Sequence, residues 1–99
     1  MPRSVELLDE ARLELEEAFR WYLSRSVRAA AGFLYEVDRG LRLVAESPSL
    51  WREFEQGSRR YLLHNYPYAL VYQERGERLV VIAVAHHKRR PSYWKARRA

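Results

Sequence analysis

The stretch "RLVVIAVAHH" (residues 78–87) is the most informative part of the chain for the fold. Every position from Leu79 to Ala85 is apolar, and most of these residues are β-branched, which favours a strand. A strand that is apolar at every position needs cover on both of its faces. The stretch therefore predicts a strand with helices on one face and the C-terminal segment or a partner chain on the other.

Two further strand-like runs precede this stretch. The runs "RRYLLHNY" (59–66) and "YALVYQE" (68–74) supply aromatic and β-branched residues, and Pro67 marks a turn between them. The sequence "ERGER" (74–78) then places Gly76, which tolerates a positive φ, ahead of the last strand. These features predict an antiparallel meander of three strands.

The first half of the chain has helical spacing instead. Residues 3–8, "RSVELL", are short and apolar enough for a first strand, and Asp9 and Glu10 place negative charge at a helix N-terminus. The first apolar stripe consists of Ala11, Leu15, Ala18, Phe19 and Tyr22. The second stripe consists of Ala30, Phe33, Val37, Leu41 and Val44. Two antiparallel helices are therefore expected.

The limits of these helices can also be predicted. The sequence "SRS" (24–26) breaks the first helix, and Ser26 can cap the second, which Pro48 ends near residue 47. Gly32 and Gly40 weaken a helix, so we expect them to permit close packing against the first helix. The expected fold is α+β, an N-terminal helical hairpin packed on a small antiparallel sheet.

Length and composition exclude several classes of protein. The chain has 99 residues, which suits a single domain over residues 1–99, and it contains no cysteine for a disulfide, a thiolate zinc site or a cysteine nucleophile. The N-terminal residues lack the apolar core of a signal peptide, and no run approaches the ~20 apolar residues of a spanning helix. We therefore expect a soluble cytoplasmic protein with no membrane association.

The charge is distributed unevenly along the chain. Residues 1–50 carry seven arginines against nine acids, whereas residues 51–99 carry eleven basic residues against four acids. A basic half favours a polyanion or an acidic protein as partner, and a solvated basic face is the alternative.

The closing segment "HHKRRPSYWKARRA" (86–99) holds the candidates for catalysis. His86 could act as a general acid or base near neutral pH, with Arg89 and Arg90 stabilising charge and Tyr93 assisting. The alternative is a strand-end histidine that is hydrogen-bonded to backbone. A metal site is not expected, because adjacent residues of a strand point to opposite faces and His64 is the only other histidine. We expect no cofactor.

Basic and aromatic side chains of the same half are candidates for target or RNA binding. If the second and last strands lie close, their basic clusters share one concave region that could bind phosphates. Tyr93 and Trp94 could stack on an unpaired base, or Trp94 could pack on the sheet instead. The acids Glu14, Glu16 and Glu17 are interpreted as a solvated helix face. The target-binding candidates are Arg59, Arg60, Lys88, Trp94 and Arg97.

Four parts of the chain, in this order, resemble the RelE/ParE superfamily of bacterial toxins. These proteins are the toxin halves of type II toxin–antitoxin modules and are also described as plasmid-stabilisation proteins. The parts are "DEARLELEEAFRWY" (9–22), "SP" (47–48), "SRRYLLHNYPYALVYQ" (58–73) and "VVIAVAHHKRRPSYWKARR" (80–98). The resemblance implies a helical hairpin on an antiparallel sheet. It also implies a cognate antitoxin that wraps the toxin in a hetero-oligomer.

The resemblance leaves three functions open. RelE-like members cleave mRNA on the ribosome without a metal, using basic residues with a tyrosine or histidine, whereas ParE-like members inhibit DNA gyrase. In "PYALVYQ" (67–73) Ala69 occupies the position of a catalytic arginine of the RelE pattern "GYRLVYQ". The turn Tyr66-Pro67-Tyr68 is also more typical of ParE-like members. We therefore favour a gyrase inhibitor over an mRNA endoribonuclease, with an inactive toxin fold as the third alternative.

Overall fold

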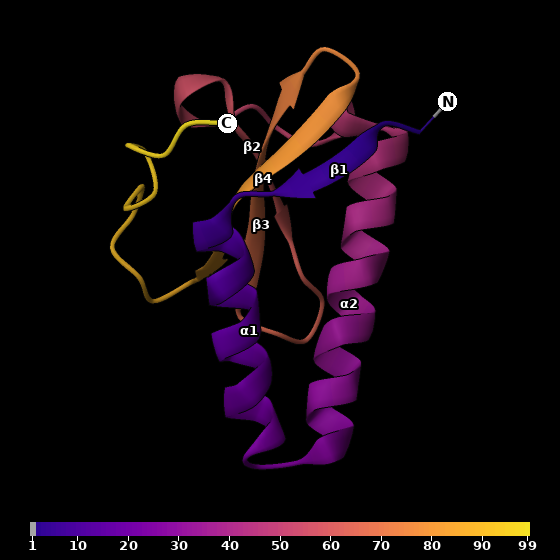
Figure 1. Cartoon of the computed structure of the whole chain (residues 1–99), viewed down its shortest axis with the longest axis vertical. Helices are drawn as coiled ribbons and strands as arrows, with labels where there is room; N and C mark the ends of the chain where they lie inside the picture. Colours follow the sequence, from indigo (N-terminus) through magenta and orange to yellow (C-terminus); the bar gives the residue numbers. More distant parts are fainter. Residues whose placement is uncertain (1) are drawn as a thin grey trace.

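Two helices pack on a four-stranded sheet in the computed structural model, which describes residues 2–99 (Figure 1). The strands lie in the order β1-β4-β3-β2. The elements are β1 (Ser4–Leu7), α1 (Asp9–Leu23), α2 (Val27–Glu46), β2 (Arg59–Leu62), β3 (Tyr68–Arg75) and β4 (Arg78–His86). Two single-turn 3₁₀ helices, Pro48–Leu50 and Glu55–Gly57, join α2 to β2.

The helical hairpin forms where the sequence predicted it. The side chain of Ser26 accepts a hydrogen bond from the backbone N–H of Ala29, and this N-cap starts α2 immediately after the break. Helix α2 ends at Glu46, two residues before Pro48. Gly76 has φ +62° in the turn between β3 and β4, a conformation that glycine adopts without strain.

The sheet is mixed, because β1 pairs with β4 in parallel. Ser4 lies opposite Arg78 and Leu7 opposite Val81, whereas β2, β3 and β4 form the antiparallel meander that was expected. Four residues at an edge carry no pattern that distinguishes parallel from antiparallel pairing, so this direction was not predicted from the sequence.

Strand β4 contains one extra residue relative to β3. Val71 pairs with Ala83 and Tyr72 pairs with Val81, so Ile82 has no partner of its own in β3. Such a β-bulge changes the direction in which the following backbone groups point. The bulge lies just beyond Val81, where the pairing of β4 with β1 ends.

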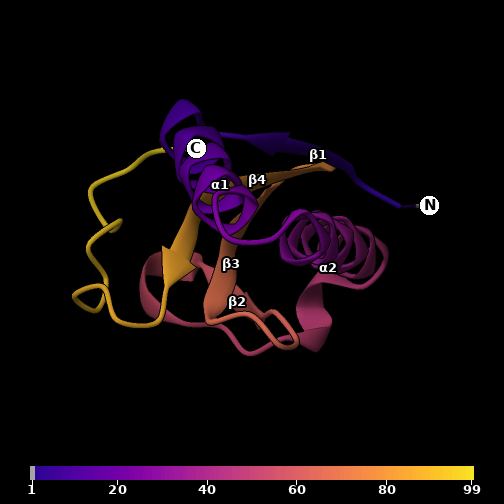
Figure 2. The ribbon, with the colours of Figure 1, turned by 90° about the horizontal axis from the view of Figure 1, so that it is seen from below.

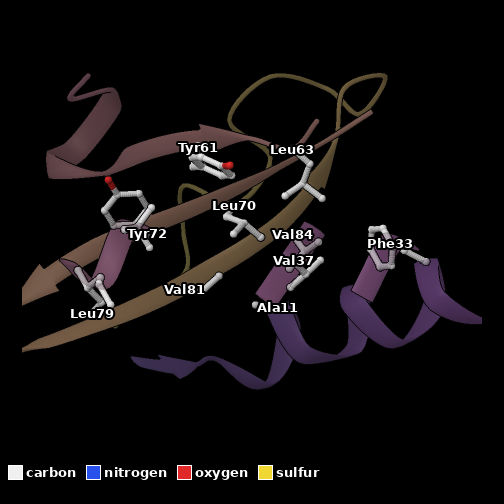
Figure 3. Close-up of a cluster of buried hydrophobic side chains, with 13 residues drawn as sticks. Ala11, Phe33, Val37, Tyr61, Leu63, Leu70, Tyr72, Leu79, Val81 and Val84 are labelled. Atoms are coloured by element: carbon white, nitrogen blue, oxygen red, sulfur yellow. The ribbon is translucent and has the colours of Figure 1, made fainter. Parts of the chain in front are cut away.

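The apolar core has two parts, one on each face of the sheet. The larger part lies between the sheet and the two helices, and Figure 3 shows Ala11, Phe33 and Val37 of the helices facing Leu70 and Val84 of the strands. The smaller part lies on the opposite face and contains Val71, Val80, Ile82, Ala83 and Trp94. Figure 2 shows α2 and the C-terminal segment on opposite sides of β3 and β4.

Both faces of β4 are therefore covered, as its apolar sequence predicted. Leu79, Val80 and Val81 are each 1% exposed or less. The cover on the second face comes from the chain's own C-terminal segment, one of the two alternatives open at the sequence level. No helix within residues 2–99 combines the length and the apolar character needed to cross a membrane.

The two glycines of α2 pack against the sheet rather than against α1, which corrects the expectation from the sequence. A Cβ atom at Gly40 would lie 2.6 Å from a ring carbon of Tyr61 in β2. A Cβ atom at Gly32 would meet the hydroxyl of Tyr66, which donates a hydrogen bond to the backbone carbonyl of Ala29. Two tyrosines of the sheet side therefore require glycine on this face of the helix.

Candidate functional site

Glu14 of α1 is the centre of a polar cluster at the outer edge of β4. Its Oε2 accepts hydrogen bonds from the hydroxyl of Tyr93 at 2.7 Å and from Nη2 of Arg97 at 3.0 Å. Its Oε1 accepts from the backbone N–H of Val84 at 2.9 Å and from Nη1 of Arg97 at 3.0 Å. One carboxylate thus joins α1, β4 and the C-terminal segment.

The cluster replaces a missing neighbour strand. Beyond Val81 no strand within residues 2–99 pairs with the outer side of β4, and the bulge at Ile82 turns backbone groups toward that side. The carbonyl of Ile82 accepts a hydrogen bond from Arg97 at 2.9 Å, and the N–H of Val84 donates to Glu14. Backbone groups at a sheet edge that is covered must find partners, and these two side chains supply them.

Glu14 is not part of a solvated face, so the interpretation made from the sequence is wrong for this residue. Its side chain is 12% exposed, whereas Glu16 and Glu17 are exposed as expected. Glu14 lies three residues after Ala11 and four before Ala18, both of which are buried. An acid at helical spacing within an apolar stripe is the signal that would have identified it.

Tyr93 is held in this cluster by its hydroxyl and by its ring. The guanidinium of Arg89 lies 3.8 Å from the ring centroid and that of Arg97 lies 5.2 Å away. Burial, together with the hydrogen bond to Glu14, raises the pKa of Tyr93 above the ordinary value for tyrosine. The hydroxyl therefore stays protonated at neutral pH and donates a hydrogen bond to Glu14.

Trp94 and Arg97 were candidates for binding a target, and the structure uses both internally. Trp94 is 3% exposed and packs against Phe54, with 6.0 Å between the ring centroids. This placement is the packing alternative, and it leaves no free indole face for a base. Arg97 is bound to Glu14 and to the carbonyl of Ile82, so its guanidinium is not a free cation.

A small basic pocket of about 110 Å³ lies on the same face as Trp94. Arg60 of β2 lines it together with Arg89 and Arg90, and Ala69 and Ala85 form part of its wall. The guanidinium of Arg60 also lies 4.7 Å from the ring centroid of Phe54. The structure therefore brings one arginine of β2 to the basic residues that follow β4, in the concave region expected from the sequence.

Arg59 and Lys88 do not line this pocket. Arg59 donates a hydrogen bond to the carbonyl of Trp51 at 2.7 Å and lies 3.7 Å from a carboxylate oxygen of Glu74. Lys88 is exposed in the turn after β4. Adjacent strand residues point to opposite faces, which separates Arg59 from Arg60.

His86 is hydrogen-bonded to backbone, as the alternative interpretation proposed. Its Nδ1 accepts from the backbone N–H of Lys88 at 3.0 Å, and its ring packs edge-on against Tyr68 with 4.9 Å between centroids. Burial, with the nearby His87 and Lys88, lowers the pKa of His86. The neutral imidazole is thus favoured, and because Nδ1 accepts from Lys88, Nε2 carries the ring hydrogen and acts as a donor.

A larger groove of about 450 Å³ runs between α1 and the ends of β3 and β4. Its lining is mainly apolar and includes the charged residues Glu14, Glu17 and Arg89. The residues that line it include Ala18, Trp21, Tyr22, Pro67, Tyr68, Val84 and His86. A concave apolar surface of this kind suits a peptide segment of another chain.

Together the fold and the cluster define a small α+β protein whose basic C-terminal segment is locked onto its sheet. The same fold occurs in a solved structure described as "Chromosomal ParDE TA system from P. aeruginosa", with a TM-score of 0.75. The match covers 85% of this chain and 95% of that chain at 14% sequence identity, which supports the fold alone. A search of curated proteins found no match.

The family model described as "ParE toxin of type II toxin-antitoxin system, parDE" matches residues 5–91. The chain therefore belongs to the ParE toxin family. It is the toxin component of a type II toxin–antitoxin system, and its partner is an antitoxin. The resemblance to the RelE/ParE superfamily is confirmed on its ParE-like side.

Proposed function

We propose that the toxin acts as a binding protein that inhibits DNA gyrase and that a cognate antitoxin neutralises it in a cytoplasmic hetero-oligomer. The observation that carries this proposal is the engagement of Tyr93 and Arg97 by Glu14. Groups that a nuclease would direct at RNA are here committed to holding the C-terminal segment on the sheet.

The basic pocket supports the same conclusion. Ala69, which stands where the RelE pattern has a catalytic arginine, is 2% exposed and lines the pocket. Its methyl group offers neither charge nor a hydrogen bond to a phosphate. Tyr93 lines the pocket as well, but its hydroxyl donates to Glu14, and burial with this hydrogen bond raises its pKa, which disfavours a role as base.

The second candidate is a ribosome-dependent mRNA endoribonuclease, and one observation favours it. Arg60, Arg89 and Arg90 meet at one pocket, and His86 also lines it with a neutral imidazole. The Nε2–H of His86 could protonate the leaving 5′-oxygen, and the cations could stabilise the charge that develops on the phosphate. As a base on the ribose 2′-hydroxyl, His86 would first have to release the N–H of Lys88 from Nδ1. In this candidate the catalytic residues would be His86, Arg89 and Arg90.

Two assays with the purified toxin separate the candidates. The first measures supercoiling of plasmid DNA by gyrase, and the second maps mRNA ends after incubation with translating ribosomes. We expect inhibition of supercoiling and no codon-specific cuts. Cuts that disappear in Arg90→Ala and persist in Arg98→Ala, a matched exposed arginine, would establish the nuclease instead.

Tyr93→Phe provides a further distinction. The substitution removes only the hydroxyl that donates to Glu14, so it should lower the stability of the toxin. If the toxin acts by binding, the variant should still inhibit gyrase at a temperature where it is folded. Loss of all activity in the folded variant would contradict the gyrase proposal.

A further inference from the structure

The tip of the helical hairpin, residues 20–28 ("RWYLSRSVR"), combines exposed apolar side chains with positive charge. It comprises the last turn of α1, the connecting residues and the first turn of α2. Figure 1 shows this tip extending beyond the end of the sheet, at the bottom of the view and far from the C-terminus. The core and the Glu14 cluster make no use of its exposed side chains.

Three apolar side chains of the tip face solvent. Val27 is 74% exposed, Trp21 is 51% exposed and Leu23 is 44% exposed. Single exposed apolar residues are ordinary, but three within seven positions at the end of a projecting element form a patch. Such a patch indicates a contact surface.

The charge of the tip differs from that of the rest of the N-terminal half. The tip contains Arg20, Arg25 and Arg28 and no acid, whereas the other residues of 1–50 carry four arginines against nine acids. None of these three arginines forms an ion pair within the part of the chain that the structure describes. The positive charge is thus available to a partner.

Trp21 is already held in one position. The guanidinium of Arg25 lies 3.8 Å from the centroid of its ring, and Tyr22 packs edge-on against it with 5.1 Å between centroids. Arg25 is itself fixed by a 3.0 Å hydrogen bond to Oγ of Ser24, which donates to the carbonyl of Trp21. A tryptophan that is ordered before binding loses little conformational entropy in a complex, and tryptophan and arginine dominate binding hot spots.

The shape and chemistry of the tip select one kind of partner. Trp21 also lines the groove along α1, which suits a peptide segment, but Leu23 and Val27 do not line it. The projecting tip itself needs a concave partner. Arginines favour an acidic surface. The aliphatic side chains of Leu23 and Val27 favour an apolar-lined protein recess over nucleic acid, whose phosphates they do not complement.

The geometry points to the hairpin tip as the surface that inserts into an acidic, apolar-lined recess of the protein that this toxin inhibits. This inference rests on the proposed function only in that the toxin acts by binding a protein. It does not require that the protein be gyrase.

Val27→Asp tests the inference directly. Val27 is the first residue of α2, where an acid is favourable to the helix dipole, so the variant should fold as the wild type does. The substitution removes apolar contact and places negative charge against an acidic recess. Leu50→Asp is the matched control, because Leu50 is 72% exposed and lies in the 3₁₀ turn that follows α2.

Three readouts are needed: growth arrest after induced expression, co-purification with the cognate antitoxin, and thermal melting. We expect Val27→Asp to abolish growth arrest while antitoxin binding and melting remain as in Leu50→Asp. With gyrase, the concentration for half-inhibition should rise about tenfold or more, as for loss of a hot-spot contact. Arg28→Glu should behave like Val27→Asp, and Arg42→Glu on the same helix should not.

The outcomes separate this inference from the proposed target. Unchanged growth arrest in Val27→Asp and Arg28→Glu would overturn the inference even if the wild type inhibits gyrase. Loss of arrest in both variants would support it even if the wild type leaves gyrase unaffected. Loss of antitoxin binding would overturn it by assigning the tip to the antitoxin. A further outcome concerns a double-stranded DNA fragment. If Arg28→Glu loses both DNA binding and growth arrest while Val27→Asp keeps both, the tip would be assigned to nucleic acid and the inference would be overturned.

Discussion

Glu14 connects three parts of the chain that lie far apart in sequence. Its carboxylate accepts hydrogen bonds from Val84 of β4 and from Tyr93 and Arg97 of the C-terminal segment. The side chains of Glu14 and Arg97 are 12% and 17% exposed, so water competes weakly for these bonds. A buried charge that is fully hydrogen-bonded is tolerated, but a charge whose partner is removed is not.

We expect Glu14→Ala to lower the free energy of unfolding by about 3 kcal/mol, near the lower end for breaking a buried ion pair. The loss arises because Arg97 and the N–H of Val84 are left without their acceptor. Urea denaturation followed by tryptophan fluorescence measures it. Glu16→Ala, which removes an exposed acid of the same helix, should change stability by less than about 0.5 kcal/mol. Equal effects of the two substitutions would contradict the role assigned to Glu14.

Helix α2 shows how one element can satisfy two demands at once. Its apolar stripe, predicted from the spacing of residues such as Phe33 and Val37, lies in the larger core. Its glycines occupy the same face, and there the tyrosines of the sheet side approach the helix backbone. Helix propensity alone disfavours glycine at these positions, so the close packing of the tyrosines accounts for the two glycines.

Gly40→Ala should destabilise the protein by about 1–3 kcal/mol, as expected for overpacking a core. The added Cβ would lie 2.6 Å from the ring of Tyr61, which is 5% exposed and cannot move freely. This cost should exceed the gain of roughly 1 kcal/mol that alanine brings to a helix. Thermal melting measures the difference, with the exposed Arg42→Ala of the same helix as control. A higher melting temperature for Gly40→Ala would show that Tyr61 relaxes without cost.

At the scale of the whole molecule, the C-terminal segment completes the domain. Trp94 packs onto the face of the sheet formed by Val71, Val80 and Ile82, opposite the helices. Without this segment an apolar face would be open to solvent, which in a small protein promotes association. The segment that looked like a basic tail in the sequence is therefore part of the core.

Trp94→Ala should lower the free energy of unfolding by about 3–5 kcal/mol, the range for large-to-small changes at buried aromatic residues. The exposed apolar face should also bind a hydrophobic dye and increase self-association. Equilibrium unfolding and size-exclusion chromatography test these two effects. Lys95→Ala, an exposed neighbour, should leave both unchanged. A Trp94→Ala variant as stable as the wild type would contradict the second core.

The amino-acid sequence by itself determined the elements and their faces. The apolar run of β4, the helical stripes, the cap at Ser26 and the turn at Gly76 were all predicted correctly. Each of these features depends on residues within a few positions of one another, which is the range over which hydrophobic periodicity and turn chemistry act. The resemblance over nearly the whole chain then indicated the family.

Only the tertiary structure decided which side chains meet. The parallel pairing of β1 and the bulge at Ile82 depend on how strands register across the sheet. The bonds of Glu14 to Val84 and Arg97 join positions 70 and 83 residues apart. Local patterns carry no information on contacts at that separation, because these contacts form only when the whole chain closes around its core.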